Sequence, residues 1–357
     1  MVKKRVEWID ISRGIAIIAV IIGHSLGKYW LGGFAKFIFA FHMPIFFVLS
    51  GYLFHLQSKK VVLKKGIFNL LLPYAGTVMI ELLILFFCKI FPNSYLYSRF
   101  GNANQLIIAG IYGVGSRPTL PFSNDMSWIG AIWFLMAMFF ATQIFNSVML
   151  VKFKENDLLK KGIIIVTLTF LGVSISPFVT LPFSLSAALC SQSFIFSGYV
   201  LKRFKLLKQV NGKIMIILLM IWLISAKVGR LSMLSATSPN MFVSIVGGIA
   251  ASVFIMRVSI LFEKRLSGEK LGNIKKIFTF WGSQSLLILC FHLIELDNVR
   301  LWGTITDALG GRISYVTIII IGIVYRILFA SVCAFIVKYL PLLRNVYMNR
   351  KFPFKFQ

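Results

Sequence analysis

Long apolar segments, separated by short polar stretches rich in lysine and arginine, follow one another along almost the whole chain. A helix needs about 20 apolar residues to cross a bilayer. Ten segments approach that length, at residues 9–27, 35–54, 67–91, 129–151, 162–177, 183–201, 214–229, 241–262, 277–296 and 315–340. We therefore expect an all-α fold, a polytopic membrane helical bundle of about ten transmembrane helices. The fifth and sixth segments are short and could form a kinked pair.

The composition agrees with a membrane protein. The mean hydropathy is +0.85 and 14% of the residues are charged, against about 25% in soluble domains. A net charge of +27 would suit a nucleic-acid-binding protein. The basic residues, however, lie in short loops between apolar segments, which is the positive-inside pattern. We predict no nucleic-acid partner, only membrane lipids around the helices.

Charge also predicts the orientation. If the N-terminus is cytoplasmic, 26 of the 38 lysines and arginines fall on the cytoplasmic side. Both termini are then cytoplasmic. We assign residues 1–345 to one transmembrane domain and 346–357 to a short basic cytoplasmic tail. The long stretch 92–128 falls outside, where it could be a binding element or lid, or a tether anchored by interfacial aromatic residues.

The first segment holds the most informative polar residues. Arg13 and His24 are eleven residues apart, so on a helix they share one stripe, roughly 16 Å apart along the axis. Asp10 lies one turn before Arg13. Ionisable groups are costly in a membrane helix, and they are functional candidates by default. On the predicted topology Arg13 is near the cytoplasmic end and His24 near the outer end, which suggests a buried path between two sites.

Two more histidines, His42 and His292, are predicted at the same outer depth as His24, on the second and ninth segments. Histidine can serve as base, acid, nucleophile or metal ligand, or as a polar contact between helices. Catalysis is favoured for His24. A zinc site is disfavoured because the histidines lack a HxxxH spacing. The four cysteines sit in apolar segments without a CxxC pair, so we predict no metal and no disulfide.

Arg13 has two interpretations. It could pair only with Asp10, or it could hold a phosphate or diphosphate at the cytoplasmic surface. Lys64 and Lys65 lie on the same side, where they could extend a positive funnel or be ordinary positive-inside charge. Glu81, Arg257 and Arg326 also fall inside apolar segments, where we expect them to be paired with each other or with backbone groups.

The residues of the first two segments resemble a known family. Asp10-x-x-Arg13 precedes Gly23-His24, and the next segment reads Phe41-His42-Met43-Pro44-x-Phe46-Phe47-x-x-Ser50-Gly51-Tyr52. This run resembles the membrane acyltransferase-3 family, bacterial O-acyltransferases of the plasma membrane that modify cell-surface polysaccharides. Leu72-Pro73-Tyr74, Trp133-Phe134-Leu135 and Gly282-x-x-Ser285-Leu286 up to His292 are similar to later landmarks of the family. The likeness is greatest to the fucose- and capsule-acetylating type.

The resemblance implies acetyl-CoA as the donor and a sugar hydroxyl of a glycan or lipid-linked sugar as the acceptor. It implies that Arg13 and His24 are essential. We assign His24 and Asp10 to catalysis, and Arg13, Lys64 and Lys65 to the donor. Many members carry Arg-x-x-Arg where this chain has Lys64-Lys65.

The acceptor residues are assigned as His42, Ser50, Trp133 and His292. His24 could be a general base or form an acetyl-histidine. The alternative function is a transporter or flippase of a lipid-linked sugar or an ion. A non-enzymatic scaffold would leave Arg13 and His24 without a purpose, and a homo-oligomer is left open.

Overall fold

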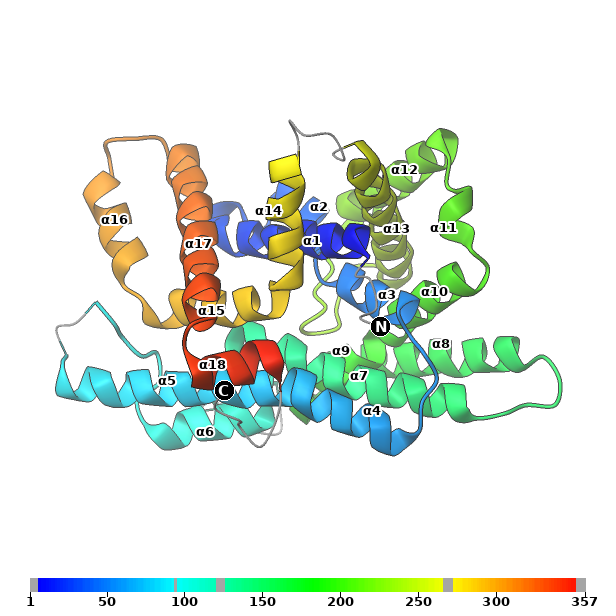
Figure 1. The fold of residues 1–357 in the computed structure, drawn as a ribbon, viewed down its shortest axis with the longest axis horizontal. Helices are drawn as coiled ribbons and strands as arrows, with labels where there is room; N and C mark the ends of the chain where they lie inside the picture. Colours follow the sequence, from blue (N-terminus) through cyan, green and yellow to red (C-terminus); the bar gives the residue numbers. More distant parts are fainter. Residues whose placement is uncertain (1–5, 93–94, 120–125, 266–271, 351–357) are drawn as a thin grey trace. The chain divides into compact units, whose positions relative to one another are not determined.

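The computed structural model describes residues 6–92, 95–119, 126–265 and 272–350, and these are helical almost throughout (Figure 1). No strand forms among them. The described residues contain two isolated β-bridges, which pair Leu96 with Val299 and Ser232 with Thr237. The predicted all-α fold is confirmed.

Seven described helices are long and apolar enough to cross a membrane, and two bent helix pairs raise that number to nine. The seven are Glu7–Ser25, Gly33–Tyr52, Lys59–Ile90, Gly130–Leu150, Asp157–Ile175, Met241–Arg265 and Tyr315–Val337. The bent pairs are Pro182–Cys190 with Gln192–Arg203, at 46°, and Gly272–Ser283 with Ser285–Asn298, at 74°. The polytopic membrane bundle is confirmed, whereas the count of about ten and the cytoplasmic termini stay predictions.

Every predicted apolar segment coincides with a helix or a bent pair. The segment without a counterpart among the nine is 214–229, which forms the 17-residue helix α12, Gly212–Val228. Segment 35–54 is two helices, α2 (Gly33–Phe39) and α3 (Pro44–Tyr52), joined by a turn. Pro44 opens α3 because a first helical position has no need of the backbone N–H that proline lacks.

The chain divides into two compact units, and each is described separately. The first contains Met1–Lys59, Ala141–Ser174 and Ser186–Ser285, and the second contains Lys60–Phe140, Ile175–Leu185 and Leu286–Gln357. Helix α7 (Trp133–Leu150) contributes residues to both units. So does the stretch formed by α4 (Lys59–Gly66), a π-helical turn (Ile67–Leu71) and α5 (Leu72–Ile90).

The first unit is built around α1 (Glu7–Ser25), which packs against α13 (Met241–Arg265) and α14 (Gly272–Ser283). Glycines bring α1 and α14 into backbone contact. A Cβ on Gly14 would lie 2.4 Å from the Phe278 carbonyl oxygen, and one on Gly282 would lie 1.6 Å from the Asp10 carbonyl oxygen. No larger side chain fits at either crossing point without a backbone shift.

The other pairs of the first unit are α3 with α10 (Gln192–Arg203) and α12 with α13, the latter side by side in Figure 1. Helices α3 and α10 also meet through glycine: a Cβ on Gly51 would lie 1.8 Å from the Ile195 carbonyl oxygen. Close approach through small residues is how membrane helices gain packing contacts where lipid is as apolar as leucine.

The second unit places α5 beside α6 (Ala103–Tyr112), and the Tyr74 hydroxyl donates to the Gly110 carbonyl at 2.6 Å. A π-helical turn at Asn345–Asn349 also packs on α5, where the Tyr347 and Thr77 hydroxyls are 2.9 Å apart. The predicted tail boundary at residue 345 falls at this turn. Residues 351–357 lie outside the described residues.

The rest of the second unit is α15 (Ser285–Asn298), α16 (Leu301–Leu309) and α17 (Tyr315–Val337). The predicted outer stretch is fastened to the end of α15. The Tyr97 backbone N–H donates to the Asn298 carbonyl at 3.0 Å, and the Arg300 N–H donates to the Tyr95 carbonyl at 2.8 Å. These bonds attach residues 95–97 to the end of α15, and the choice between a binding element and an aromatic tether stays a prediction.

Candidate functional site

Asp10, Arg13 and His24 all lie on α1, a single continuous helix of 19 residues. Glu7 and Asp10 occupy its first turn, where carboxylates complement the helix dipole, and His24 lies in the last turn. The Arg13 Nη1 is 3.9 Å from the Asp10 Oδ1. The Asp10 side chain is 5% exposed and that of Arg13 is 33% exposed, so the pair joins a buried carboxylate to an accessible cation.

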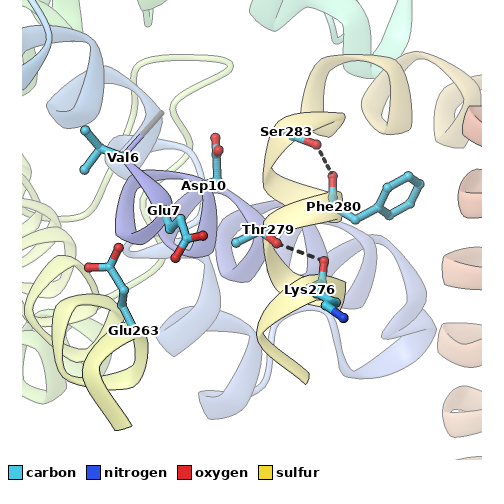
Figure 2. Close-up of a pocket in the computed structure, with 8 residues that line it drawn as sticks. All are labelled: Val6, Glu7, Asp10, Glu263, Lys276, Thr279, Phe280 and Ser283. Carbon is cyan, nitrogen blue, oxygen red and sulfur yellow. Dashed lines mark hydrogen bonds between the residues drawn. The ribbon is translucent and has the colours of Figure 1, made fainter. Parts of the chain in front are cut away.

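A pocket of about 720 Å³ opens beside Asp10 (Figure 2). Its lining comes from the start of α1, the end of α13 and the length of α14: Val6, Glu7, Asp10, Glu263, Lys276, Thr279, Phe280 and Ser283. The Thr279 and Ser283 hydroxyls donate to carbonyls of their own helix, Thr279 to Lys276 and Ser283 to Phe280, each in the 2.8–2.9 Å range. Their lone pairs stay available to a ligand that donates hydrogen bonds.

The charge of this pocket is mixed. Glu7, Asp10 and Glu263 contribute carboxylates, and Lys276 contributes an ammonium group. Lys275, next to Lys276 on α14, forms an ion pair with Glu7. The lining carboxylates can therefore accept hydrogen bonds from amide N–H groups of a ligand. Cations for an anionic group are present on Lys276 in the lining, and on Lys275 and Arg13, which pair with Glu7 and Asp10.

The opposite end of α1 brings His24 and His42 together. His24 is exposed, whereas His42 is 5% exposed in the turn between α2 and α3. The His42 Nδ1 is 3.1 Å from the Ile38 carbonyl oxygen, and the ring lies edge-on to Phe39 with centroids 4.7 Å apart. The two histidines interact electrostatically. The turn created by Pro44 thus delivers a second imidazole to the end of α1.

Arg230 is a residue of this region that the sequence did not indicate. It follows α12 in a tight loop, in which Ser232 and Thr237 exchange two backbone hydrogen bonds. Its guanidinium carbon lies 4.0 Å from the Trp30 ring centroid and 4.1 Å from that of Phe39. Burial lowers the pKa of the Arg230 guanidinium, which keeps its charge because arginine is protonated at all physiological pH.

The remaining predicted site residues lie in different places. Ser50 is half-buried on α3 in the first unit. Lys64 and Lys65 are exposed on α4 in the second unit. Trp133, 7% exposed at the start of α7, and His292, fully buried on α15, also belong to the second unit. The structure therefore joins Asp10 with Arg13 and His24 with His42, and holds the other candidates on separate elements.

Buried charges form their own network in the second unit. The Arg326 Nε donates to the Glu295 Oε2 at 3.0 Å, and His292 Nδ1 lies 3.9 Å from the same oxygen. Arg99 pairs with Asp297 at 3.3 Å. Arg326 is thus paired as expected, but with Glu295 rather than Glu81. Glu81 is completely buried, and its carboxylate accepts no hydrogen bond from the described residues.

The described residues contain no group of three His, Cys, Asp or Glu side chains that could hold a metal ion. The four cysteines are free. The groups at the two ends of α1 are an arginine, carboxylates and imidazoles, which can bind an anion and move a proton.

Comparisons with known proteins identify the family of the chain. The acyltransferase-3 family model, described as "Acyltransferase domain", matches residues 6–335. The chain belongs to this family, and the predicted resemblance is confirmed. It carries an acyltransferase domain over nearly its whole length.

Two curated relatives are both named "Nodulation protein NolL". The one from Sinorhizobium fredii (strain NBRC 101917 / NGR234) is 29% identical over 189 residues, 49% of this chain and 45% of the relative. The one from Mesorhizobium japonicum (strain LMG 29417 / CECT 9101 / MAFF 303099) is 26% identical over 208 residues, 55% of this chain and 50% of the relative. The match spans about half the length of these relatives. No solved structure matches the chain.

Proposed function

We propose that this protein is a multi-pass O-acetyltransferase of the bacterial plasma membrane. It moves an acetyl group from cytoplasmic acetyl-CoA to a sugar hydroxyl of a cell-surface polysaccharide or its lipid-linked precursor. The observation that carries the proposal is the arrangement of α1 within an acyltransferase domain. A pocket lined by Asp10, whose carboxylate pairs with Arg13, lies at one end of this helix, and His24 with His42 lies at the other.

The donor is assigned to the Arg13 end. On the charge-predicted topology this end faces the cytoplasm, where acetyl-CoA is made. The phosphates of coenzyme A need cations, and in this proposal Arg13 of the first unit supplies one. Lys64 and Lys65, in the second unit, keep their assignment to the donor from the sequence alone. The pantetheine arm is neutral and has two amide N–H groups. The carboxylates of Glu7, Asp10 and Glu263 suit such donors better than they suit phosphate.

The chemistry is assigned to the His24 end. His24 takes the proton of the sugar hydroxyl as that oxygen attacks the thioester carbonyl, a general-base role worth about 10²- to 10⁴-fold. Its exposure leaves room for an acceptor to approach. Asp10 assists by holding Arg13 through their ion pair. An acetyl-histidine route would use the same residue as nucleophile.

The acceptor is assigned to His42, Ser50, Trp133 and His292. His42 is the one with direct support, because it interacts with His24 and is held by Ile38 and Phe39. Trp133 and His292 are buried, and these two residues and Ser50 keep their assignment from the sequence resemblance.

The test compares surface glycan from cells that contain the gene, lack it, or carry His24→Ala. Mass spectrometry should show O-acetyl groups with the wild-type gene alone, while the polymer itself is made in all three. Loss of the whole polymer without the gene would contradict the proposal and favour a transporter. Normal acetylation in the His24→Ala cells would remove His24 from the mechanism.

A further inference from the structure

Arg230 is held in an arrangement that leaves its hydrogen-bond donors unused. Within the described residues it forms no ion pair and no hydrogen bond, and its Nε is buried without a partner. The contacts that fix it are ring contacts with Trp30 and Phe39. Guanidinium N–H groups radiate in the plane of the group, so ring contacts with its carbon orient this fork without consuming it.

Phe39 links Arg230 to both histidines. Its ring contacts the Arg230 guanidinium on one side and the His42 ring at 4.7 Å on another. It also packs on Gly23, the neighbour of His24, where an added Cβ would lie 3.3 Å from the Phe39 Cε2. His42 interacts electrostatically with His24 and with Arg230. One aromatic ring therefore gathers a fixed cation and two imidazoles at the same end of the first unit.

An acyl transfer needs such a cation. As the acceptor oxygen attacks, the carbonyl π electrons move onto the carbonyl oxygen, and stabilising that charge is usually the largest single contribution to catalysis. A half-buried cation that ring contacts already orient is suited to this because it need not reorganise during the reaction. Arg13 cannot fulfil the same role at this end, because it lies eleven residues before His24 on α1, roughly 16 Å away.

Resting on the proposed function, we propose that Arg230 is a catalytic residue that donates N–H bonds to the thioester carbonyl oxygen in the transition state. His24 takes the hydroxyl proton while the sugar oxygen forms its bond to the carbonyl carbon. The electron pair displaced onto the carbonyl oxygen is held by Arg230. When the pair returns, the C–S bond breaks, and the thiolate of coenzyme A takes the proton from the His24 imidazolium.

The test is steady-state kinetics of Arg230→Met and Arg230→Lys. The purified full chain is given acetyl-CoA and surface glycan extracted from cells that lack the gene. Removing one oxyanion donor typically costs about 10²- to 10³-fold in kcat. We expect a loss of that size in Arg230→Met, with the KM for acetyl-CoA and for glycan each within about threefold of wild type. Arg230→Lys keeps the charge but not the planar fork of N–H donors, and its kcat should fall between those of Arg230→Met and wild type.

A matched control is Arg203→Met. Arg203 also lies over two rings, those of Tyr199 and Phe204 at 6.0 and 5.9 Å, but on the opposite side of the membrane in the predicted topology. Its loss should leave kcat unchanged. Chemical rescue distinguishes a catalytic from a structural role of Arg230. Added guanidinium ion should restore part of the kcat of Arg230→Ala, which it cannot do for a misfolded protein.

The outcomes separate the two proposals. If wild type transfers acetyl groups and Arg230→Met keeps its kcat, or loses only affinity for glycan, the oxyanion role is overturned and the acetyltransferase stands. If Arg230→Met fails to fold, the other variants decide. The oxyanion role is overturned if Arg230→Lys has wild-type kcat, or if guanidinium ion does not rescue Arg230→Ala. If wild type transfers no acetyl group from acetyl-CoA, both proposals fall together.

Discussion

The carbonyl oxygen of Asp10 lies directly against Gly282, so closely that a Cβ at residue 282 would come within 1.6 Å of it. This contact fixes the crossing of α1 and α14 beside the pocket that Asp10 and Ser283 line. The position of the Asp10 and Arg13 pair therefore depends on a glycine more than 270 residues later in the chain.

Gly282→Ala should destabilise the protein. Alanine is favoured over glycine in a helix by about 0.5–1 kcal/mol, so an unhindered substitution would stabilise. Here the added methyl group must push two backbones apart, and we expect a net loss of about 1–3 kcal/mol. Thermal unfolding in detergent measures the sign. Gly272→Ala, on the same helix with nothing within 4 Å of its Cβ, is the control and should not lower the Tm.

The charge pair of Glu295 and Arg326 makes a second prediction. Glu295 is 1% exposed and its Oε2 lies 3.0 Å from Arg326. Arg326→Met should cost about 3–5 kcal/mol because it leaves a buried carboxylate without its cation. The double variant Glu295→Gln with Arg326→Met removes both charges and should recover most of the loss. A double variant no more stable than Arg326→Met in denaturant unfolding would contradict this account.

The attachment of the outer stretch to α15 is also testable. Asn298 is fully buried, and its side chain donates to the Tyr97 carbonyl at 3.1 Å. Asn298→Ala should speed amide hydrogen exchange across residues 95–100, since a lost hydrogen bond of this kind is worth about 0.5–1.5 kcal/mol. Thr304→Ala, which removes an exposed hydroxyl three residues into α16, is the matched control. Unchanged exchange in Asn298→Ala would show that this hydrogen bond does not hold residues 95–100 on α15.

The sequence predicts the helices better than their interruptions. Continuous apolar runs locate the long helices because a bilayer demands that length. They miss shorter ones: α6 (Ala103–Tyr112) forms inside the stretch 92–128, which we expected to be non-helical, and α16 (Leu301–Leu309) lies between two predicted segments. The break at residues 40–43, the π-helical turn at Ile67–Leu71 and the 74° bend after Ser283 leave hydropathy unchanged, so a hydropathy pattern does not reveal them. Pro44 and Pro73, each in the first turn of a helix just after an interruption, are local signals that an average of hydropathy does not use.

The candidate site divides in the same way. Asp10, Arg13 and His24 were found from their spacing, because one helix determines their relation. Arg230 was missed because its partners, Trp30 and Phe39, are some 200 residues away in the chain. The pocket of Figure 2 was missed for the same reason: it arises only when α1, α13 and α14 meet.

Arg13 should act on the donor. If its guanidinium binds coenzyme A phosphates, Arg13→Ala loses a charged hydrogen bond worth about 1.5–3 kcal/mol. We expect the KM for acetyl-CoA to rise about 10- to 100-fold and kcat to change little. Arg13→Lys keeps the charge without the bidentate fork, so its KM for acetyl-CoA should lie between those of wild type and Arg13→Ala. A variant with normal KM for acetyl-CoA but reduced Tm would show that Arg13 serves only its ion pair with Asp10.

The central claim is that the two ends of α1 divide the reaction, with donor binding at Arg13 and proton transfer at His24. The most direct test is the kinetics of His24→Ala beside His55→Ala, an exposed histidine at the other end of the second predicted span. We predict that His24→Ala lowers kcat about 10²- to 10⁴-fold with an unchanged KM for acetyl-CoA, and that His55→Ala matches wild type. A His24→Ala protein with wild-type kcat, or one whose whole defect is a raised KM for acetyl-CoA, would contradict the account.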